Sequence, residues 1–316
     1  MNPPWTTADI ASQAGKRILI TGANSGIGYH AALMLARKGA QVILACRDKQ
    51  RGEDALARLN TEAPGAHAEL ALLDLASLAS VRQFAEQELA AQRPLHILVN
   101  NAGVMAPPKR LETADGFELQ FGTNVLGHFV LTAMLMPALE RAAAQSAEQP
   151  RVVTIASIAH KRGRIDFNDL QSTRHYSPMR AYQQSKLADL MFAFELDRRL
   201  RAANSRVMSV AAHPGVAQTN LFRGGDRSAI SRAARDVLGL VIGSLLNTDD
   251  AGALPTVYAA TSPDVRDGGY YGPQGWMEAR GRKAGAAYVA SQASDTSNAA
   301  RLWQVCEDLT HTRFTV

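Results

Sequence analysis

Tyr182 and Lys186 are the side chains that most directly suggest chemistry in this sequence. They are four positions apart in AYQQSKLADL (181–190), a stretch otherwise typical of a helix, so they lie on one helix face, one turn apart. An ammonium beside a phenol favours the phenolate and lowers the pKa of a phenol. The pair could therefore move protons near neutral pH, or it could belong to an ordinary amphipathic helix. The surrounding elements have to decide between these two interpretations.

Apolar segments that are expected to form strands alternate with segments of helical periodicity. The expected strands are 17–20, 40–46, 68–75, 95–100, 151–157 and 206–215, and the expected helices include 26–39, 77–92, 112–145 and 180–202. Strands that are apolar on both faces and alternate with helices indicate a parallel sheet covered on both sides. The sequence therefore predicts an α/β fold with a single doubly wound Rossmann-type domain.

No repeat or linker divides this pattern, and the chain of 316 residues is long enough for one large core. The predicted boundaries are a flexible leader (1–15) and one domain (16–316), which includes a substrate lid (about 220–250) and a C-terminal extension (about 276–316). Charged residues make up 20% of the chain and low-complexity tracts are missing, so we expect disorder only at the ends.

The composition also bears on the binding partners that we expect and on the cellular compartment. The net charge of +5 comes from scattered basic residues, so we do not expect nucleic acid as a partner. Cys46 and Cys306 are far apart and the N-terminal stretch has no apolar core of a secretory signal, which favours a reduced, cytoplasmic setting. The histidines do not show zinc-ligand spacing, so no metal is expected.

A glycine-rich turn separates the first expected strand from the first expected helix. ILITGANSGIG places Gly22, Gly26 and Gly28 there, with Ser25 and Ile27 between them. Glycine lets backbone approach a phosphate, and the N-terminus of the helix offers free N–H groups and a positive dipole end. The turn therefore predicts a dinucleotide site, against the alternative of a glycine-rich turn without a ligand.

The end of the second expected strand bears on the choice of cofactor. An acid at this position accepts a hydrogen bond from an unphosphorylated ribose, but here Cys46 and Arg47 stand there. Arg47 can bind a 2′-phosphate with two hydrogen bonds, whereas Asp48 would contact the ribose poorly if it caps the next helix. We therefore predict NADP(H) over NAD(H), against the alternative of a surface arginine.

Motifs along most of the chain resemble those of the short-chain dehydrogenase/reductase family. The resemblance runs from about residue 16 to 275, and its motifs are TGANSGIG, Asp74–Leu75, NNAG (100–103), Asn124, Ser157, YQQSK (182–186) and HPG (213–215). The ending YYGPQG…NAARLWQVCEDLT further resembles the branch that includes retinol dehydrogenases and light-dependent protochlorophyllide reductases.

The resemblance implies a role for each matching position. Asp74 and Leu75 would border the adenine, and Asn101, Ala102 and Gly103 would lie on the adenosine side. Pro214 and Gly215 would also contact the cofactor, and Thr219 would help to hold the nicotinamide or pyrophosphate. The expected catalytic residues are Asn124, Ser157, Tyr182 and Lys186, and the last two would also contact the cofactor.

These roles describe a hydride transfer that is balanced by a proton. Tyr182 would be the general acid in carbonyl reduction and the base in alcohol oxidation, with Lys186 stabilising the phenolate and bonding the ribose. Ser157 would donate a hydrogen bond to the substrate oxygen, and Asn124 would position a water. The alternatives are a capping serine at 157 and a structural asparagine at 124.

Several features leave the substrate and assembly open. The lid is apolar in its later part, which favours a small hydrophobic carbonyl or alcohol substrate. Peripheral membrane contact by the same segment is an alternative that we do not favour. Ser157 and Tyr182 are 25 positions apart, which leaves room for an added loop, and the sequence does not decide between monomer and dimer. His160 and His175 could touch substrate, but a loop role is expected.

Two other functions share some of these features. A non-catalytic NADP-sensing module has no need of the four catalytic residues. A light-dependent pigment reductase shares the Tyr182–Lys186 pair, but the sequence shows no specific pigment signature.

Overall fold

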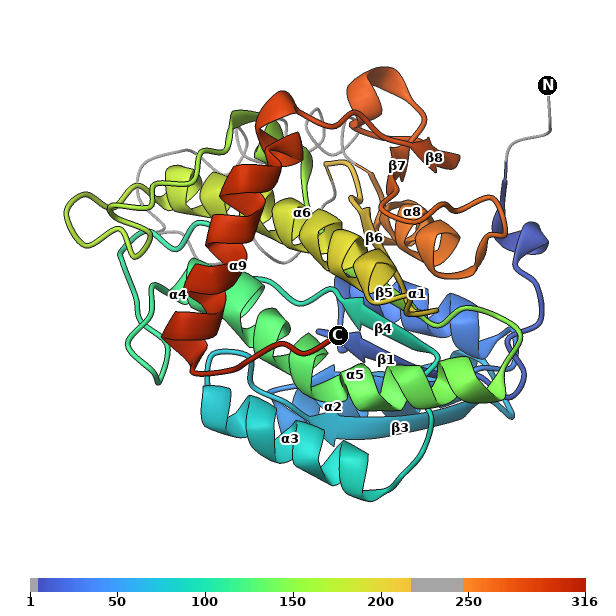
Figure 1. The fold of residues 1–316 in the computed structure, drawn as a ribbon. Coiled ribbons are helices and arrows are strands. Elements are labelled where there is room, and N and C mark those ends of the chain that lie inside the picture. The colour runs from blue at the N-terminus through green and yellow to red at the C-terminus, as the bar shows by residue number, and fades with distance from the viewer. Residues whose placement is uncertain (1–4, 217–246) are drawn as a thin grey trace.

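The computed structural model of the protein describes residues 5–216 and 247–316. Thr219 and nearly all of the predicted substrate lid lie outside these residues. Within them, eight strands form one sheet in the order β3-β2-β1-β4-β5-β6-β7-β8 (Figure 1). The strands are β1 (Arg17–Thr21), β2 (Gln41–Cys46), β3 (His67–Leu72), β4 (Ile97–Asn100), β5 (Arg151–Ile155), β6 (Met208–Ala212), β7 (Tyr270–Pro273) and β8 (Ala284–Ala286).

The predicted doubly wound α/β fold is confirmed, with one difference at the edge of the sheet. Pairing is parallel from β3 through to β7, but β8 runs antiparallel to β7. Residues 274–283, which include the helical turn Trp276–Glu278, connect β7 to β8, and no crossover helix is needed because the two strands are antiparallel. The sheet is therefore parallel except for its last strand.

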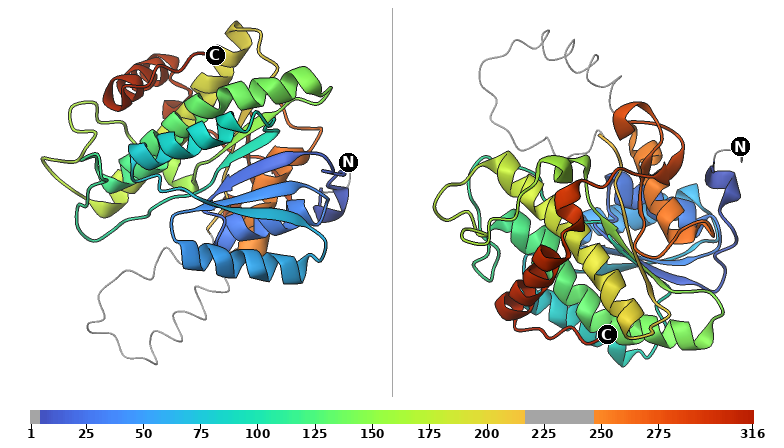
Figure 2. Two further views of the ribbon diagram at one scale, coloured as in Figure 1. Left: turned by 90° about the horizontal axis from the view of Figure 1, so that it is seen from below. Right: turned by 45° about the horizontal axis from the view of Figure 1, so that its top comes forward.

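Helices cover both faces of the sheet (Figures 1 and 2). They are α1 (Gly26–Ala36), α2 (Lys49–Glu62), α3 (Leu78–Ala90), α4 (Leu119–Phe121), α5 (Gly127–Gln145), α6 (Pro178–Ala202), α8 (Asp249–Thr261) and α9 (Thr296–Thr310). Shorter helical turns lie at Thr7–Asp9, Gly122–Leu126, Ile158–Arg162, Trp276–Glu278 and Ser291–Ser294.

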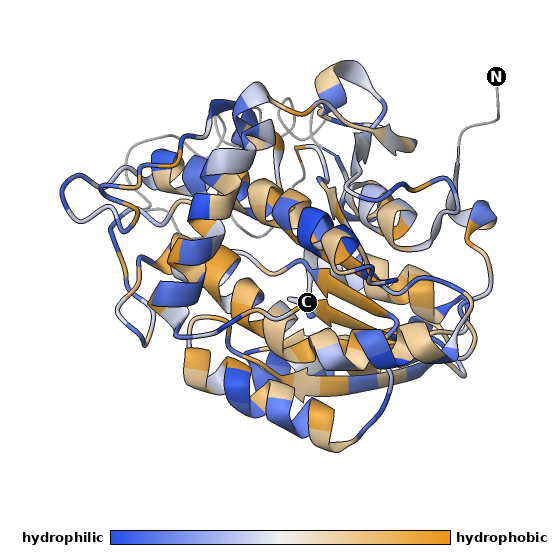
Figure 3. Ribbon diagram, in the orientation of Figure 1, coloured by the Kyte–Doolittle hydropathy of each residue, from blue (hydrophilic) through white to orange (hydrophobic). Residues whose placement is uncertain are grey.

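Alternate residues of each central strand point into two different hydrophobic cores, one on each face of the sheet. In β1, Leu19 joins the cluster made with α3, α5, α6 and α9, whereas Ile18 and Ile20 join the cluster made with α1, α2 and α8. All three side chains are fully buried, as expected for a strand with a period of two. The apolar strands between the two helical layers are visible by hydropathy in Figure 3. This two-sided burial explains why the central strands are mostly apolar on both faces.

The helical region predicted at 112–145 begins later, at Leu119. Glu112 and Glu118 instead form an isolated β-bridge, and the carboxylate of Glu118 accepts hydrogen bonds from the N–H groups of Gln120 and Phe121. Glu118 thereby caps the helix at a point that periodicity alone does not reveal. The continuous helix Leu119–Gln145 is long and apolar enough to cross a membrane, but 83% of its most apolar window is buried, as in a core helix.

Residues 5–15 of the predicted leader contact the rest of the domain. Trp5 packs edge-on against Tyr258 of α8 with ring centroids 5.2 Å apart, and Ile10 is buried in the same core cluster as α1 and α8. The backbone N–H of Gln13 donates to the carbonyl of Lys38 at 2.8 Å. The apolar side chains at 5 and 10 thus tie this segment to the domain.

The C-terminal extension packs against the central helices. In Figure 1, α9 crosses α6, and Trp303 of α9 stacks with Phe192 of α6 at a centroid distance of 5.8 Å. The ring of Phe129 of α5 contacts Trp303 edge-on, with ring centroids 5.2 Å apart. The ring of Phe314 also packs against Trp303, with a centroid distance of 4.7 Å. The extension is therefore an integral part of one hydrophobic core.

Candidate active site

A cavity of about 610 Å³ opens at the carboxyl ends of the parallel strands, where open α/β sheets bind ligands. Most residues predicted from the sequence line it. They are Gly22, Ser25, Gly26, Ile27, Gly28, Arg47, Asp74, Leu75, Asn101, Ala102, Gly103, Ser157, Tyr182, Lys186, Pro214 and Gly215. Asn124 does not line the cavity, and Thr219 lies outside the described residues. One cavity therefore brings together three of the four predicted catalytic residues and the described cofactor residues from many separate segments.

The glycine turn has the shape that a phosphate site needs. Gly22 and Gly26 have φ angles of +67° and +58°, in the region that favours glycine. A Cβ at Gly28 would lie 2.5 Å from Nδ2 of Asn101 and 2.6 Å from the carbonyl oxygen of Gly22. A side chain at position 28 would therefore push α1 away from Gly22 and Asn101. The turn can therefore present the N-terminus of α1 directly to an anion.

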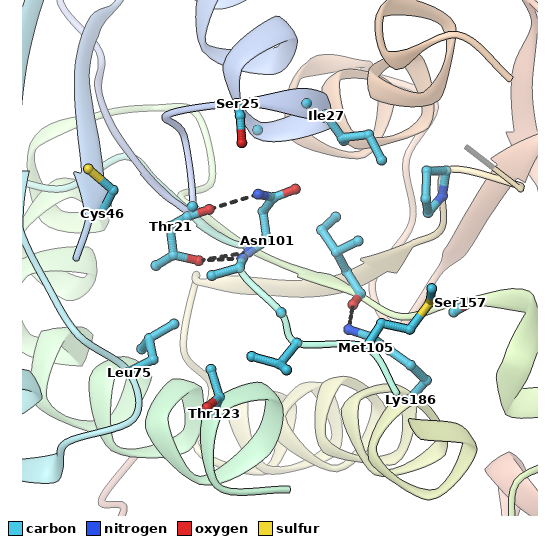
Figure 4. Close-up of a pocket in the computed structure, with 18 of the residues that line it drawn as sticks. Thr21, Ser25, Ile27, Cys46, Leu75, Asn101, Met105, Thr123, Ser157 and Lys186 are labelled. Atoms are coloured by element: carbon cyan, nitrogen blue, oxygen red, sulfur yellow. Dashed lines mark hydrogen bonds between the residues drawn. The ribbon is translucent and has the colours of Figure 1, made fainter. Parts of the chain in front are cut away.

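Thr21 fastens the strand before this turn to the NNAG segment (Figure 4). Its Oγ1 accepts hydrogen bonds from the backbone N–H groups of Asn101 and Ala102, both at 2.9 Å. In return, Nδ2 of Asn101 donates to the carbonyl oxygen of Thr21 at 2.7 Å. Thr21 was not predicted as a site residue, although its place at the end of the strand was a usable signal.

His128 extends this network to the helix behind the cavity. Its Nε2 is 2.9 Å from Oγ1 of Thr21, and its Nδ1 is 2.8 Å from the carbonyl oxygen of Asn124. A neutral ring with the proton on Nδ1 satisfies both contacts. Burial lowers the pKa of His128 to about 3, which keeps the ring neutral.

Asn124 lies in a wide helical turn, Gly122–Leu126, between α4 and α5. Its Oδ1 accepts from the N–H of Val104 at 2.8 Å, and its Nδ2 donates to the carbonyl of Val104 and to Oγ of Ser185. The side chain is fully buried. Asn124 therefore joins the segment after NNAG to α6, and its predicted role in positioning a water stays a prediction.

Two arginines lie at the end of the cavity formed by β2. Arg47 follows the strand, as predicted. Arg51 lies in the first turn of α2 and was missed. Asp48 caps α2, since its Oδ1 accepts from the N–H of Arg51 at 3.0 Å. This confirms the expected cap and turns the acid toward its own helix. The spacing of Arg47 and Arg51 was a signal that could have identified the second cation.

Ser157 and Tyr182 line the cavity together with Lys186. Figure 4 shows Ser157 and Lys186 on the side of the cavity opposite Cys46. Oγ of Ser157 accepts from the N–H of Ala159 at 3.2 Å, so the serine does cap the turn after β5. A hydroxyl that accepts in this way still has its own O–H to donate. The capping role and the predicted catalytic role are therefore compatible.

Lys186 has a partner that sequence reasoning missed. Its Nζ donates to the carbonyl oxygen of Ile155 and to Oδ2 of Asp189, each at 2.8 Å. Lys186 is 5% exposed and Asp189 is 3% exposed, so this is a buried ion pair. The sequence could have indicated this pair, because Lys186 and Asp189 are three positions apart on one helix and therefore lie on the same face.

The segment between Ser157 and α6 packs onto that helix. A Cβ at Gly163 would lie 2.5 Å from the carbonyl oxygen of Gln183, and Nδ1 of His160 lies 2.7 Å from the carbonyl of Ser157. His160 is fully buried and His175 is exposed, and neither lines the cavity. His160 lies in the short helical turn Ile158–Arg162, and the expected loop role of both histidines stays a prediction. Among the described residues, no group of three or more His, Cys, Asp or Glu side chains could hold a metal ion.

Comparisons with known proteins agree with this geometry. A family model described as short chain dehydrogenase matches residues 16–227. The chain is 44% identical to a polyprenol dehydrogenase of Mus musculus over 260 residues, which span 82% of this chain and 76% of that protein. It is 41% identical to retinol dehydrogenase 13 of Homo sapiens over 298 residues, which span 93% and 84% of the two chains.

A solved structure extends the likeness to nearly the whole fold. The crystal structure of an uncharacterised protein from Mycobacterium paratuberculosis is 40% identical, with a TM-score of 0.80, over 99% of this chain and all of that one. The chain belongs to the short-chain dehydrogenase family, whose members use NAD(P)(H). Within that family it lies in the retinol dehydrogenase-like branch, as its C-terminal motifs predicted.

Proposed function

We propose that this protein is an NADP(H)-dependent oxidoreductase that transfers hydride between nicotinamide and a hydrophobic carbonyl or alcohol. The observation that carries the proposal is the meeting of Ser157, Tyr182 and Lys186 with the glycine turn around one cavity. A non-catalytic sensing module needs only the glycine turn. The relay residues at the other end of the same cavity favour an enzyme.

The residues around the cavity fit a phosphorylated dinucleotide. Gly22 and Gly28 let the backbone approach a pyrophosphate, and the N-terminus of α1 supplies free N–H groups. Arg47 and Arg51 supply two cations at the β2 end, where the acid Asp48 is engaged in its own cap. Two cations near a ribose favour a 2′-phosphate over a free hydroxyl. This supports NADP(H) as the cofactor.

The protein supplies the proton chemistry at the other end. When bound, the nicotinamide supplies or accepts the hydride. The hydroxyl of Tyr182 donates its proton to the substrate oxygen in reduction, and the phenolate of Tyr182 accepts the proton of the alcohol in oxidation. The hydroxyl of Ser157 donates a hydrogen bond to that oxygen, and the ammonium of Lys186 stabilises the phenolate.

The surface beside these residues favours an apolar substrate. Ile158 and Ala159 follow Ser157 along the cavity, and Met179 precedes Tyr182 by one turn of α6. Met105 also lines this part of the cavity. Two relatives act, by name, on retinol and on polyprenol, which are hydrophobic alcohols. An isoprenoid or similarly apolar alcohol or aldehyde is the substrate class that we propose.

We also propose a reducing, cytoplasmic setting. Cys46 and Cys306 are both buried free thiols. Burial raises the pKa of each thiol, which keeps both as unreactive thiols at neutral pH. Fractionation of cells that produce the protein would test this, because recovery in a membrane or extracellular fraction would contradict it.

The loss of NADPH absorbance with purified protein in the dark tests the proposed function. The panel contains aliphatic, aromatic and isoprenoid aldehydes and ketones. We expect turnover with apolar members and weak turnover with short polar ones. Saturable NADPH binding without turnover on any member would count against the dark reductase, and turnover that requires light would point to a pigment reductase.

A further inference from the structure

The ammonium of Lys186 is held from two sides. One N–H donates to the carbonyl oxygen of Ile155, at the end of β5, and another donates to Oδ2 of Asp189. An ammonium has three N–H donors. With two of them committed to the protein, the third is left for the cavity that Lys186 lines. The direction of the lysine head therefore depends on its two fixed partners.

Asp189 is the charged one of these two partners, and it is buried with the lysine. Burial by itself would lower the pKa of Lys186, but the charges of Asp189 and Tyr182 outweigh it and raise that pKa. Burial raises the pKa of Asp189 to about 6, so its carboxylate is ionised at neutral pH and above. The two groups are therefore both charged where a tyrosine relay has to work.

We propose that Asp189 is a positioning residue of the active site. It keeps the ammonium of Lys186 charged and turned so that its third N–H faces the cavity, and Tyr182 thereby keeps a cation beside it. This inference rests on the proposed function for its catalytic meaning. The ion pair between Lys186 and Asp189 on α6 is observed whatever reaction the protein catalyses.

Other titratable groups around the pair do not supply this charge. His128 on α5 is neutral, because burial lowers its pKa to about 3. Burial raises the pKa of Tyr270 on β7 well above its usual value, and it also raises the pKa of Cys306 on α9, which faces Asp189. All three are uncharged near neutral pH. The balancing charge for Lys186 is therefore that of Asp189.

The variant Asp189→Asn removes the charge at nearly constant shape. The wild-type rate of alcohol oxidation should rise with pH to a plateau, because Lys186 stays charged throughout. In the variant, the buried ammonium loses its counter-charge, its pKa falls, and the rate should fall again at alkaline pH. One unit above the new pKa only about a tenth of the molecules keep the ammonium, so the rate should be about tenfold lower there.

Asp197→Asn is the matched control, because Asp197 lies on the same helix, is equally buried and pairs with Arg201 at 2.8 Å away from the cavity. It should keep the wild-type pH profile. Asp189→Glu retains the charge and should show no alkaline decline, even if its plateau is lower. If Asp189→Asn does not fold, Asp189→Glu still tests the inference, because an alkaline decline in the rate of Asp189→Glu would contradict it.

NADPH binding supplies a readout that does not need turnover. Fluorescence titrations at pH 7 and pH 10 should show affinity lost at the higher pH in Asp189→Asn but not in Asp197→Asn. A folded Asp189→Asn protein with wild-type pH dependence of both rate and binding would overturn the inference. If the wild type binds NADPH but turns over no substrate, the proposed function fails, while the binding profile still decides the role of Asp189.

Discussion

Arg47 is the side chain that bears most directly on cofactor choice. It stands at the end of β2 where an acid would select an unphosphorylated ribose, and Asp48 beside it is engaged as the cap of α2. Arg51 adds a second cation to the same end of the cavity. A 2′-phosphate placed there would accept charge-assisted hydrogen bonds, which are stronger than neutral ones.

Replacing Arg47 with alanine should therefore separate the two cofactors. We expect Arg47→Ala to raise the Kd for NADPH by about tenfold to a hundredfold and to leave the Kd for NADH nearly unchanged. Fluorescence titration with each cofactor measures both. Lys49→Ala is the matched control, because Lys49 is a nearby exposed cation that pairs with Glu53 and does not line the cavity. An equal loss for NADPH and NADH would contradict the assignment.

Local signals were sufficient to predict the strands β1 to β6 and the main site. The glycine turn, the apolar runs and the spacing of Tyr182 and Lys186 each depend on neighbours in the chain, and the structure places these segments around one cavity. The partner of Lys186 was not predicted, because its pairing with Asp189 depends on the burial of that face of α6.

The later elements were harder to predict for a physical reason. The strand β7 holds only Tyr270–Pro273, and β8 holds Ala284–Ala286, so neither is long enough to show a period. The helix α8 contains Pro255, which argues against a helix in a sequence. These elements form because the rest of the sheet and α1 give them a surface to pack on.

The docking of α9 depends on one aromatic side chain. Trp303 is 2% exposed and contacts aromatic rings of α5 and α6. We expect Trp303→Ala to lower the free energy of unfolding by about 3–5 kcal/mol, because it leaves a large cavity under α9. Urea unfolding followed by circular dichroism measures this. Gln304→Ala, at the neighbouring exposed position, should change it by less than about 0.5 kcal/mol, and a similar value for both variants would refute the role of Trp303.

At the scale of the whole molecule, buried histidines couple stability to pH. Burial lowers the pKa values of His128 and His213 to about 3, whereas a histidine in the unfolded chain titrates near 6.5. Below about pH 6.5 the unfolded state therefore binds protons that the folded state does not, and each histidine destabilises the fold as pH falls. Asp189, with a pKa raised to about 6, acts in the opposite direction.

The variant His128→Gln isolates one of these contributions. Between about pH 5.5 and pH 4, the wild type should lose about 1.4 kcal/mol more unfolding free energy per pH unit than the variant does. Urea unfolding at a series of pH values gives both slopes. The variant is expected to be less stable at pH 7, so the slope is the decisive quantity. Equal slopes would show that His128 takes up a proton in the folded state.

The contacts made by α6 bear on whether the protein is a monomer or a dimer. The segment after Ser157 packs on α6 through Gly163, and α9 packs on α6 through Trp303. Sedimentation of the purified protein would decide between monomer and dimer.

In the proposed NADP(H)-dependent hydride transfer, Tyr182 moves the proton. The most direct test compares Tyr182→Phe with the wild type in NADPH turnover on an apolar aldehyde, alongside NADPH binding by each. We predict that turnover falls by at least about a hundredfold while the Kd for NADPH changes little, because only the hydroxyl is lost. A Tyr182→Phe variant that turns over as fast as the wild type would rule out this role for Tyr182.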